Sequence, residues 1–176
     1  MGDEKRDVAV TDAGPIIHLH EISRIALLGV FAAVHIGQCV WDEAVTSGRV
    51  SEPELRNATL FHRHIVSPQD IAVVTDATAS TLHRGEVECL ALCRLLGVSL
   101  LLTDDLAARS VAASFGVRPV GSLGVVVRAF RIGRISFAQA KECLDALNDI
   151  SSLFVTRAVI DLALEQLAII RPDNYE

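Results

Sequence analysis

The sequence predicts an α/β fold built on a mostly parallel central sheet. Short apolar runs typical of buried strands alternate along the chain with longer segments of helical periodicity. The clearest strand covers residues 98–103, and its apolar centre indicates burial on both faces, as in a parallel sheet. Asp104 and Asp105 follow that strand directly. Because ligands of open α/β sheets bind beyond the carboxyl ends of the strands, this pair indicates a functional edge.

The first half of the chain alternates in this way from its first strand onward. Strands are predicted at 8–11 and 34–36, and helical segments at 15–22, 25–31, 40–45 and 51–60. Pro15 suits the first turn of a helix, and Ser51 with Pro53 marks the start of another. Residues 65–82 show only short β-like pieces and a Ser/Thr-rich tail, so no element is assigned to them.

The second half carries stronger helix signals. A helix is predicted over 85–96 and another over 106–115, ended by Gly97 and Gly116 respectively. The last strand is expected at 117–120. Three further helices are expected at 122–132, 136–147 and 156–170, and Ser136 with Gln139 forms a capping-box signature for the middle one.

Length and composition indicate one aliphatic domain. The chain has 176 residues, of which 51% are hydrophobic and only 5% aromatic. Residues 1–150 are expected to form the domain, and residues 151–176 a helical extension that packs on it or on a second subunit. No apolar run reaches the roughly 20 residues of a membrane helix, and the charged N-terminus does not resemble a signal peptide, which predicts a cytoplasmic protein without membrane contact.

The net charge of −6 argues against broad electrostatic binding of nucleic acid. Every charge between residues 106 and 141 is nevertheless positive, and the i, i+3 spacing of Arg128, Arg131 and Arg134 would place them on one helical side. These side chains either face RNA phosphates or are solvated. The four cysteines are expected to be buried, reduced thiols, since no pair with zinc-ligand spacing complements Cys89 and Cys93.

Five acidic residues fall where this architecture brings strand ends and helix starts together. They are Asp12, Glu43, Glu86, Asp104 and Asp105. Several carboxylates in one cleft repel one another, so their ionised forms need a cation, and oxygen ligands without paired His or Cys suit Mg²⁺ or Mn²⁺. Such an ion activates water for in-line attack on a phosphodiester and stabilises the leaving oxyanion.

Each acid also has a structural alternative. Asp12 could cap the helix that follows it, and Glu43 and Glu86 could be first-turn acids favoured by a helix dipole. Of the adjacent pair, one aspartate could cap helix 106–115. Glu88 is expected at the surface, and the pairs His18/His20 and His62/His64 are expected to be ordinary surface or partly buried histidines.

Five segments, in this order and spacing, together resemble a known family. They are Val10-Thr11-Asp12-Ala13-Gly14-Pro15-Ile16-Ile17, Val40-x-x-Glu43-Ala44-Val45, Gly85-Glu86-Val87-Glu88-Cys89-Leu90-Ala91-Leu92, Leu101-Leu102-Thr103-Asp104-Asp105-x-x-Ala108-Arg109 and Val120-Gly121-Ser122-Leu123-Gly124-Val125. Over about residues 7–147 the chain resembles a PIN domain, specifically the subgroup related to VapC-type toxins. The resemblance implies a three-layer α/β/α fold with extra C-terminal helices.

The resemblance also implies a function: a metal-dependent endoribonuclease, often dimeric and often paired with an antitoxin protein. By motif position the catalytic residues would be Asp12, Glu43, Glu86 and Asp105, and the metal ligands would include Asp104 as an accessory carboxylate beside Asp12, Glu86 and Asp105. Thr103 would order the turn through its hydroxyl and, with Arg109, contribute to substrate binding. Arg109 would hold a phosphate or pair with a carboxylate.

Other functions remain for comparison. A catalytically weak PIN fold could serve as an interaction or RNA-binding module. A phosphorylation-receiver domain is disfavoured because neither Lys5 nor Lys141 lies at a late strand end, and a dehalogenase-type phosphatase because Asp12-Ala13-Gly14 lacks a second acid. A dinucleotide fold is disfavoured because no G-x-G-x-x-G motif is present.

Overall fold

A computed structural model describes residues 7–78 and 82–170. The strands it describes form one parallel sheet in the order β3-β2-β1-β4-β5. They are β1 (Val8–Thr11), β2 (Ala33–Gly37), β3 (Phe61–His64), β4 (Leu100–Leu102) and β5 (Arg118–Val120). This arrangement confirms the α/β class predicted from the sequence.

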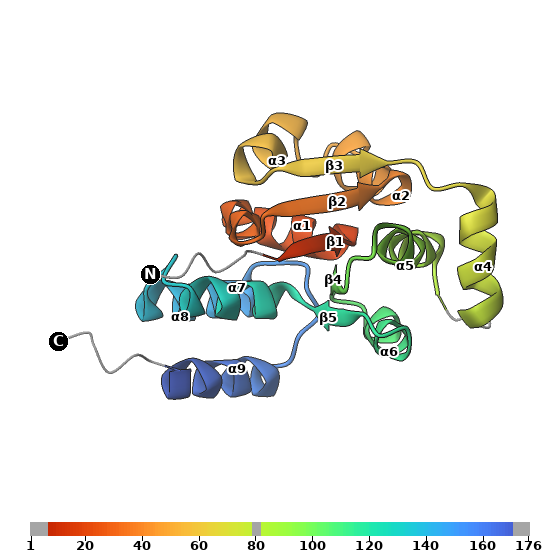
Figure 1. The fold of residues 1–176 in the computed structure, drawn as a ribbon. Helices are drawn as coiled ribbons and strands as arrows, with labels where there is room; N and C mark the ends of the chain where they lie inside the picture. Colours follow the sequence, from red (N-terminus) through yellow and green to blue (C-terminus); the bar gives the residue numbers. More distant parts are fainter. Residues whose placement is uncertain (1–6, 79–81, 171–176) are drawn as a thin grey trace.

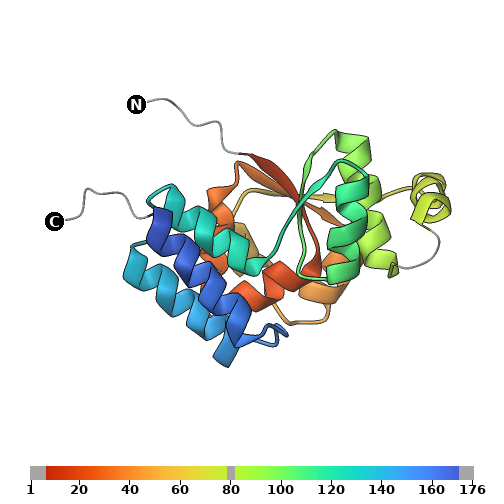
Figure 2. The same ribbon diagram turned by 90° about the horizontal axis from the view of Figure 1, so that it is seen from below.

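Helices cover both faces of the sheet, as a parallel sheet requires. They are α1 (Ala13–Glu21), α2 (Gln38–Trp41), α3 (Glu52–Ala58), α4 (Pro68–Thr78), α5 (Arg84–Leu96), α6 (Leu106–Ser114), α7 (Ser122–Arg131), α8 (Phe137–Asp149) and α9 (Arg157–Ile170), with a 3₁₀ helix η1 (Ile25–Val30) and a π-helix η2 (Asp42–Thr46). Figures 1 and 2 show α7, α8 and α9 on one side of the sheet and α5 and α6 on the other. The result is a three-layer arrangement.

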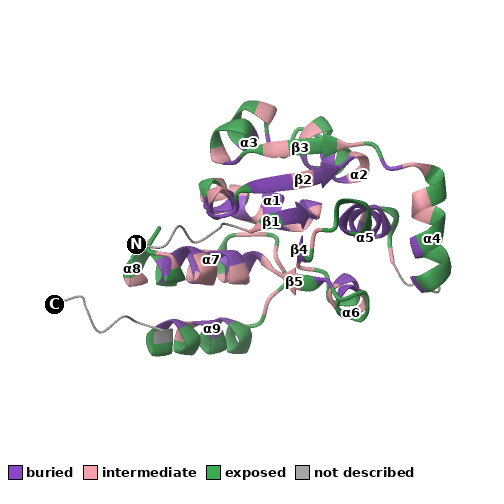
Figure 3. Ribbon diagram, viewed as in Figure 1, coloured by how far each residue is buried: buried purple, intermediate pink, exposed green. Residues whose placement is uncertain are grey.

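Strand β1 lies at the centre of the sheet and positions the candidate site. It pairs with β2 on one side and with β4 on the other, so the direction in which the chain crosses the sheet reverses at β1. Thr11 is in register with Leu102, and the backbone N–H of Asp12 donates to the carbonyl of Leu102 at 2.8 Å. Figure 3 shows β1, β2 and α5 as largely buried. Ligand sites of such sheets lie at this reversal point, beyond the carboxyl ends of the strands.

The segment between α3 and α5 holds the elements that the sequence did not predict. Phe61–His64 is strand β3, which lies at the sheet edge and pairs with β2 although three of its four residues are polar or charged. Helix α4 follows, with only Val74 and Thr78 buried along it. The helix predicted to run to Leu60 ends at Ala58, because the carbonyl of Leu60 accepts the N–H of Val34 as β3 begins. Pairing with β2, which a local pattern does not report, formed β3, whereas α4 begins at a local cap in which the Ser67 hydroxyl accepts the N–H of Asp70.

The C-terminal helix packs on α7 and α8 of the same chain. Ile160, Ala163 and Leu167 are buried in this contact, whereas Val159 and Leu162 are exposed. The rest of the predicted extension, residues 171–176, lies outside the described residues, as do the N-terminal residues 1–6 and the Ser/Thr-rich residues 79–81. None of the helices in residues 7–78 and 82–170 is both long enough and apolar enough to cross a bilayer.

The four cysteines are free thiols, as predicted. Cys89, Cys93 and Cys143 are buried, and Cys39 is half-buried. Burial raises the pKa of the Cys93 thiol to about 12 and that of Cys89 well above its ordinary value. These two side chains therefore act as small apolar groups beneath the sheet.

Candidate active site

Asp12 lies between the last residue of β1 and the first residue of α1. Its side chain makes no capping hydrogen bond to α1, so the capping alternative is not what the structure shows. Instead its Oδ2 accepts a hydrogen bond from the Thr103 hydroxyl at 3.3 Å. Burial, with further repulsion from Glu86 and Glu43, raises the pKa of the Asp12 carboxyl from 3.8 to about 6. A half-buried carboxyl that interacts with two other acidic side chains is suited to bind a cation.

Glu86 lies in the first turn of α5 and is only 8% exposed. Its Oε2 accepts the backbone N–H of His83 at 2.8 Å, so the first-turn role expected as an alternative is present. Burial again raises the pKa, and the charges of Asp105 and Glu43 raise it further. Glu86 therefore stabilises the first turn of α5 and also interacts electrostatically with other carboxylates.

Glu43 and Asp105 are the exposed members of the group. Glu43 lies in η2, directly after α2, and acts on the pKa values of both Asp12 and Glu86. Asp105 caps α6, since its Oδ1 accepts the N–H of Ala108 at 2.8 Å. We call these four residues, Asp12, Glu43, Glu86 and Asp105, the acidic cluster. Four separate elements contribute to it, and its members repel one another electrostatically.

Thr103 joins two members of the acidic cluster. Its hydroxyl donates to Asp12 and accepts the backbone N–H of Asp105, each at 3.3 Å. The residue has no exposed surface. The expected ordering of the turn is therefore seen. Contact of Thr103 with substrate stays a prediction, and it would require this buried side chain to become accessible.

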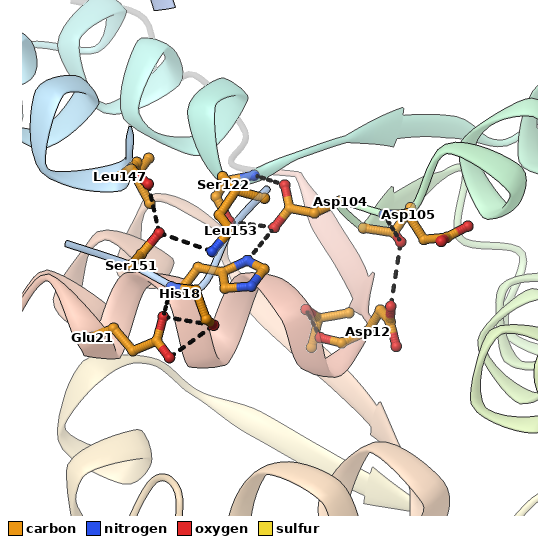
Figure 4. Close-up of polar contacts among 12 residues, drawn as sticks. Asp12, His18, Glu21, Asp104, Asp105, Ser122, Leu147, Ser151 and Leu153 are labelled. Carbon is orange, nitrogen blue, oxygen red and sulfur yellow. Dashed lines mark hydrogen bonds and ion pairs between the residues drawn. The ribbon is translucent and has the colours of Figure 1, made fainter. Parts of the chain in front are cut away.

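Asp104 belongs to a different hydrogen-bond network, and its role as an accessory metal ligand stays a prediction. Figure 4 shows its carboxylate turned toward Ser122 and His18. Oδ1 accepts the backbone N–H of Ser122 at 2.7 Å, and Oδ2 accepts the Ser122 hydroxyl at 2.5 Å and contacts Nδ1 of His18 at 2.8 Å. Both oxygens are thus engaged within the protein. This carboxylate ties α1 and α7 to the end of β4.

The two side-chain partners of Asp104 were not predicted from the sequence. From the sequence His18 is an ordinary histidine, and Ser122 is only part of a motif. One signal was accessible: Ser122 begins a helix immediately after β5, next to the strand that carries Asp104. His18 lies six residues along α1 from Asp12, and the crossing of α1 and α7 could not be deduced from spacing.

Glu88 was predicted to lie at the surface, but the structure shows it buried. It is 3% exposed, and its Oε2 accepts the backbone N–H of Cys39 at 2.7 Å. Gly37 makes this approach feasible, because a Cβ at that position would collide with the Glu88 carboxylate. Glu88 therefore fixes the start of α2, the helix that leads into η2 and Glu43.

In a comparison with protein-family models, one model matches nearly the whole length of the chain. A model described as a PIN domain matches residues 8–168. The chain belongs to the PIN domain family. PIN domains are in general nucleases, typically dependent on divalent metal ions, so membership supports a hydrolase at this coarse level. Comparisons with curated proteins and with solved structures gave no match.

Arg109 of this PIN domain lies one turn into α6. Its Nη1 donates to the carbonyl of Thr103 at 3.3 Å. In the structure the guanidinium thus binds a backbone oxygen rather than a carboxylate, which does not support the carboxylate pairing expected as one alternative. The half-buried side chain stands beside Gly121, where a Cβ would come within 3.2 Å of it. Holding a substrate phosphate remains a proposal for this residue.

The acidic cluster fits a hard divalent ion by its chemistry. Its donors are all oxygens. Burial first, and repulsion between the carboxylates second, raise the pKa of Asp12 and Glu86, and a bound Mg²⁺ or Mn²⁺ would stabilise their ionised forms. Within residues 7–78 and 82–170, no three His, Cys, Asp or Glu side chains already stand as a group that could hold an ion. Binding therefore requires side-chain rotation. The helix-capping hydrogen bonds use Asp105 Oδ1 and Glu86 Oε2. Asp105 Oδ2 and Glu86 Oε1 can therefore bind an ion while both capping bonds persist.

Proposed function

We propose that this PIN domain is a metal-dependent endoribonuclease that hydrolyses RNA phosphodiesters with Mg²⁺ or Mn²⁺. One observation carries the proposal: at the carboxyl end of β1, burial raises the pKa of the Asp12 carboxyl to about 6, and the charges of Glu86 and Glu43, from two other elements, raise it further. Ordinary surface acids show no such shift. Within a fold whose members are nucleases, this arrangement favours metal-assisted hydrolysis.

The position of each residue indicates a separate role in the proposed reaction. Asp12, Glu86 and Asp105 would hold the ion, which would supply Lewis-acid stabilisation of the leaving oxygen and lower the pKa of bound water. The Thr103 hydroxyl orients the Asp12 carboxylate through its hydrogen bond. Glu43 is exposed at the edge of the cluster, where its carboxylate can orient a water molecule by accepting its proton in a hydrogen bond. Arg109, beside the same turn, would hold a substrate phosphate.

The toxin role belongs to the same proposal. We assign the chain to the VapC-like subgroup on its motifs, and on that basis expect an antitoxin protein as partner and a homodimer in solution. Co-expression with candidate antitoxin chains, followed by growth assays and sedimentation, tests both expectations. A chain that does not slow growth and sediments as a monomer contradicts this part alone.

The decisive experiment measures cleavage of an end-labelled single-stranded RNA by the full chain. Cleavage should need Mn²⁺ or Mg²⁺, stop in excess EDTA, and be absent for the same oligonucleotide made of DNA. Asp12→Asn and Asp105→Asn should each abolish it while the protein stays folded. Asp76→Asn on α4, an exposed aspartate outside the cluster, serves as the matched control and should cut normally. Cleavage that persists in EDTA contradicts the proposal.

A second candidate is a catalytically weak PIN fold that binds RNA or a protein without cutting. The observation that favours it is that no three ligand side chains in the described part of the chain are already grouped for an ion. Calorimetry separates the two functions. Heat of Mn²⁺ binding that disappears in Asp12→Asn supports the nuclease, whereas no heat in the wild type supports the binding module.

A further inference from the structure

A concave surface lies along α7 and α9, apart from the acidic cluster. It is a groove of about 980 Å³ that reaches from the first residue of β5, Arg118, to the C-terminal end of α7. None of the residues that line it belongs to the acidic cluster. Figure 2 shows α7 and α9 side by side on the face of the sheet opposite α5 and α6. We call this surface the α7–α9 groove.

The floor of the groove is apolar. Leu123 and Val127 contribute from α7, and Val159 and Leu162 from α9. Val159 is 46% exposed and Leu162 is 55% exposed, although the same helix buries Ile160 and Leu167 completely on its other side. Helix α9 therefore has two apolar faces, and the described part of the chain covers only one. An exposed apolar strip inside a concavity is typical of a surface that binds a partner.

The rim of the groove is basic. Arg118, Arg128, Arg131 and Arg134 line it, and Asp7 is the one acidic residue among the described lining residues. Asp7 accepts hydrogen bonds from Arg128 at 2.9 Å and from Arg118 at 3.3 Å. Arg131 and Arg134 are exposed, and no acidic side chain among the lining residues other than Asp7 is present to neutralise them. This local excess of positive charge occurs on a chain whose net charge is −6.

We propose that the α7–α9 groove docks an acidic amphipathic helix of a partner protein. Apolar side chains at helical spacing would cover Val159 and Leu162, and flanking Asp or Glu would pair with Arg131 and Arg134. RNA fits less well, because single-strand binders stack bases on aromatic rings. Phe31 is the one aromatic ring among the described lining residues, and the Arg128 guanidinium already lies 5.1 Å from its centroid. This inference does not depend on the nuclease proposal.

Selection from a random peptide-display library tests the groove with an unbiased set of ligands. Peptides of about 15 residues, near the length at which isolated helices become stable, are selected on the immobilised full chain. The winners should place apolar residues at i, i+3 or i+4, and i+7, with Asp or Glu between them. A synthetic winner should bind in fluorescence anisotropy, more weakly as salt rises.

Groove variants decide where that peptide binds. Arg131→Glu combined with Arg134→Glu, and separately Leu162→Glu, should each weaken binding about tenfold or more. Arg94→Glu on α5 reverses an exposed arginine outside the groove and should leave binding unchanged. All of these positions are exposed or at the rim, and matching thermal unfolding curves would establish that the variants fold.

Three outcomes overturn the inference. Selected peptides that show no acidic excess, or that bind the groove variants as well as the wild type, exclude an acidic helix at this site. Competition by a single-stranded RNA oligonucleotide that is lost in the double arginine variant would instead make the groove a nucleic-acid surface. A dimer that dissociates in Leu162→Glu would assign the groove to a second copy of the chain.

Discussion

Partial burial removes water from the Asp12 carboxyl, and this is the first reason that its pKa rises to about 6. The folded protein therefore binds a proton on Asp12 at pH values where the unfolded chain, with a pKa near 3.8, has already lost it. Stability follows proton binding, so it falls as the pH rises from about 4 through about 6. At neutral pH an ionised Asp12 destabilises the metal-free protein, and a bound cation offsets that loss.

Replacing Asp12 should separate stability from activity. We expect Asp12→Asn to stabilise the metal-free protein at neutral pH by on the order of 2–3 kcal/mol, because Asn mimics the protonated form and can still accept from Thr103. Thermal unfolding in EDTA at about pH 7.5 and about pH 4 measures this. The gain should vanish at the lower pH, and Asp76→Asn should show none. A less stable variant at neutral pH contradicts the prediction.

Cation binding should show the complementary pH dependence. A divalent ion competes with the proton on Asp12, so affinity for Mn²⁺ should fall about tenfold for each pH unit below about 6. Calorimetric titrations of Mn²⁺ across this range provide the measurement. Affinity that is constant between about pH 5 and about pH 7.5 would show that Asp12 is not a ligand.

The two adjacent aspartates should respond differently to substitution. Asp105→Asn should change stability by less than about 0.5 kcal/mol, because Asn caps a helix as well as Asp does, yet it should abolish cleavage. Asp104→Ala should cost about 1–3 kcal/mol, since it leaves the N–H of the buried Ser122 without its partner. Urea unfolding of both variants, with cleavage assays on each, compares the two. Equal stability loss would contradict the division of roles.

At the scale of elements, close approach of backbone to side chain places the site. The turn between β5 and α7 passes so near Asp104 that a Cβ on Gly121 would lie 2.7 Å from its Oδ1. The same device operates where β2 meets α2, with Gly37 against Glu88. Strand ends and helix starts meet at the carboxyl edge of the parallel sheet, and these two glycines leave room there for the Asp104 and Glu88 carboxylates.

Gly121→Ala should therefore be destabilising, by about 1–3 kcal/mol, as the added methyl displaces Asp104 or Arg109. Gly85→Ala is the matched control. It lies in the first turn of α5, and its Cβ would meet nothing nearer than Cys39 at 3.7 Å, so alanine should be neutral or stabilise by up to about 1 kcal/mol. Chemical denaturation of both variants tests the contrast, and a neutral Gly121→Ala would contradict the packing argument.

At the scale of the whole molecule, α9 completes the core instead of standing apart from it. Ile160 and Leu167 have no exposed surface, and the helix lies against α7 and α8. The family match extends to residue 168 and so includes most of this helix. The exposed face of the same helix forms one wall of the α7–α9 groove.

Leu167→Ala should cost about 2–5 kcal/mol, as expected for a large buried side chain, and the whole chain should still unfold in one transition. Leu162→Ala, on the exposed face of α9, should change stability by less than about 0.5 kcal/mol. Denaturant curves followed by circular dichroism and by Trp41 fluorescence provide two probes. Two separate transitions would show that α9 is an independent unit.

The sequence by itself determined the α/β class, the central buried strands and the strongly capped helices, because each rests on local periodicity or on a cap within a few residues. Ser51 with Glu54 and Ser136 with Gln139 form capping boxes as such signals predict. It also indicated the four members of the acidic cluster, since strand ends in a parallel sheet meet at one edge.

Only the tertiary structure decided the remainder. Strand β3 exists because β2 offers it a hydrogen-bonding edge, and its own residues, Phe61 to His64, carry no strand pattern. The hydrogen-bond partners of two acids were likewise set by residues distant in sequence. Asp104 bonds to Ser122 and His18, and Glu88 bonds to the backbone of Cys39. Local patterns encode the periodicity of one segment, whereas the partner of a buried polar group depends on which segments the fold brings together.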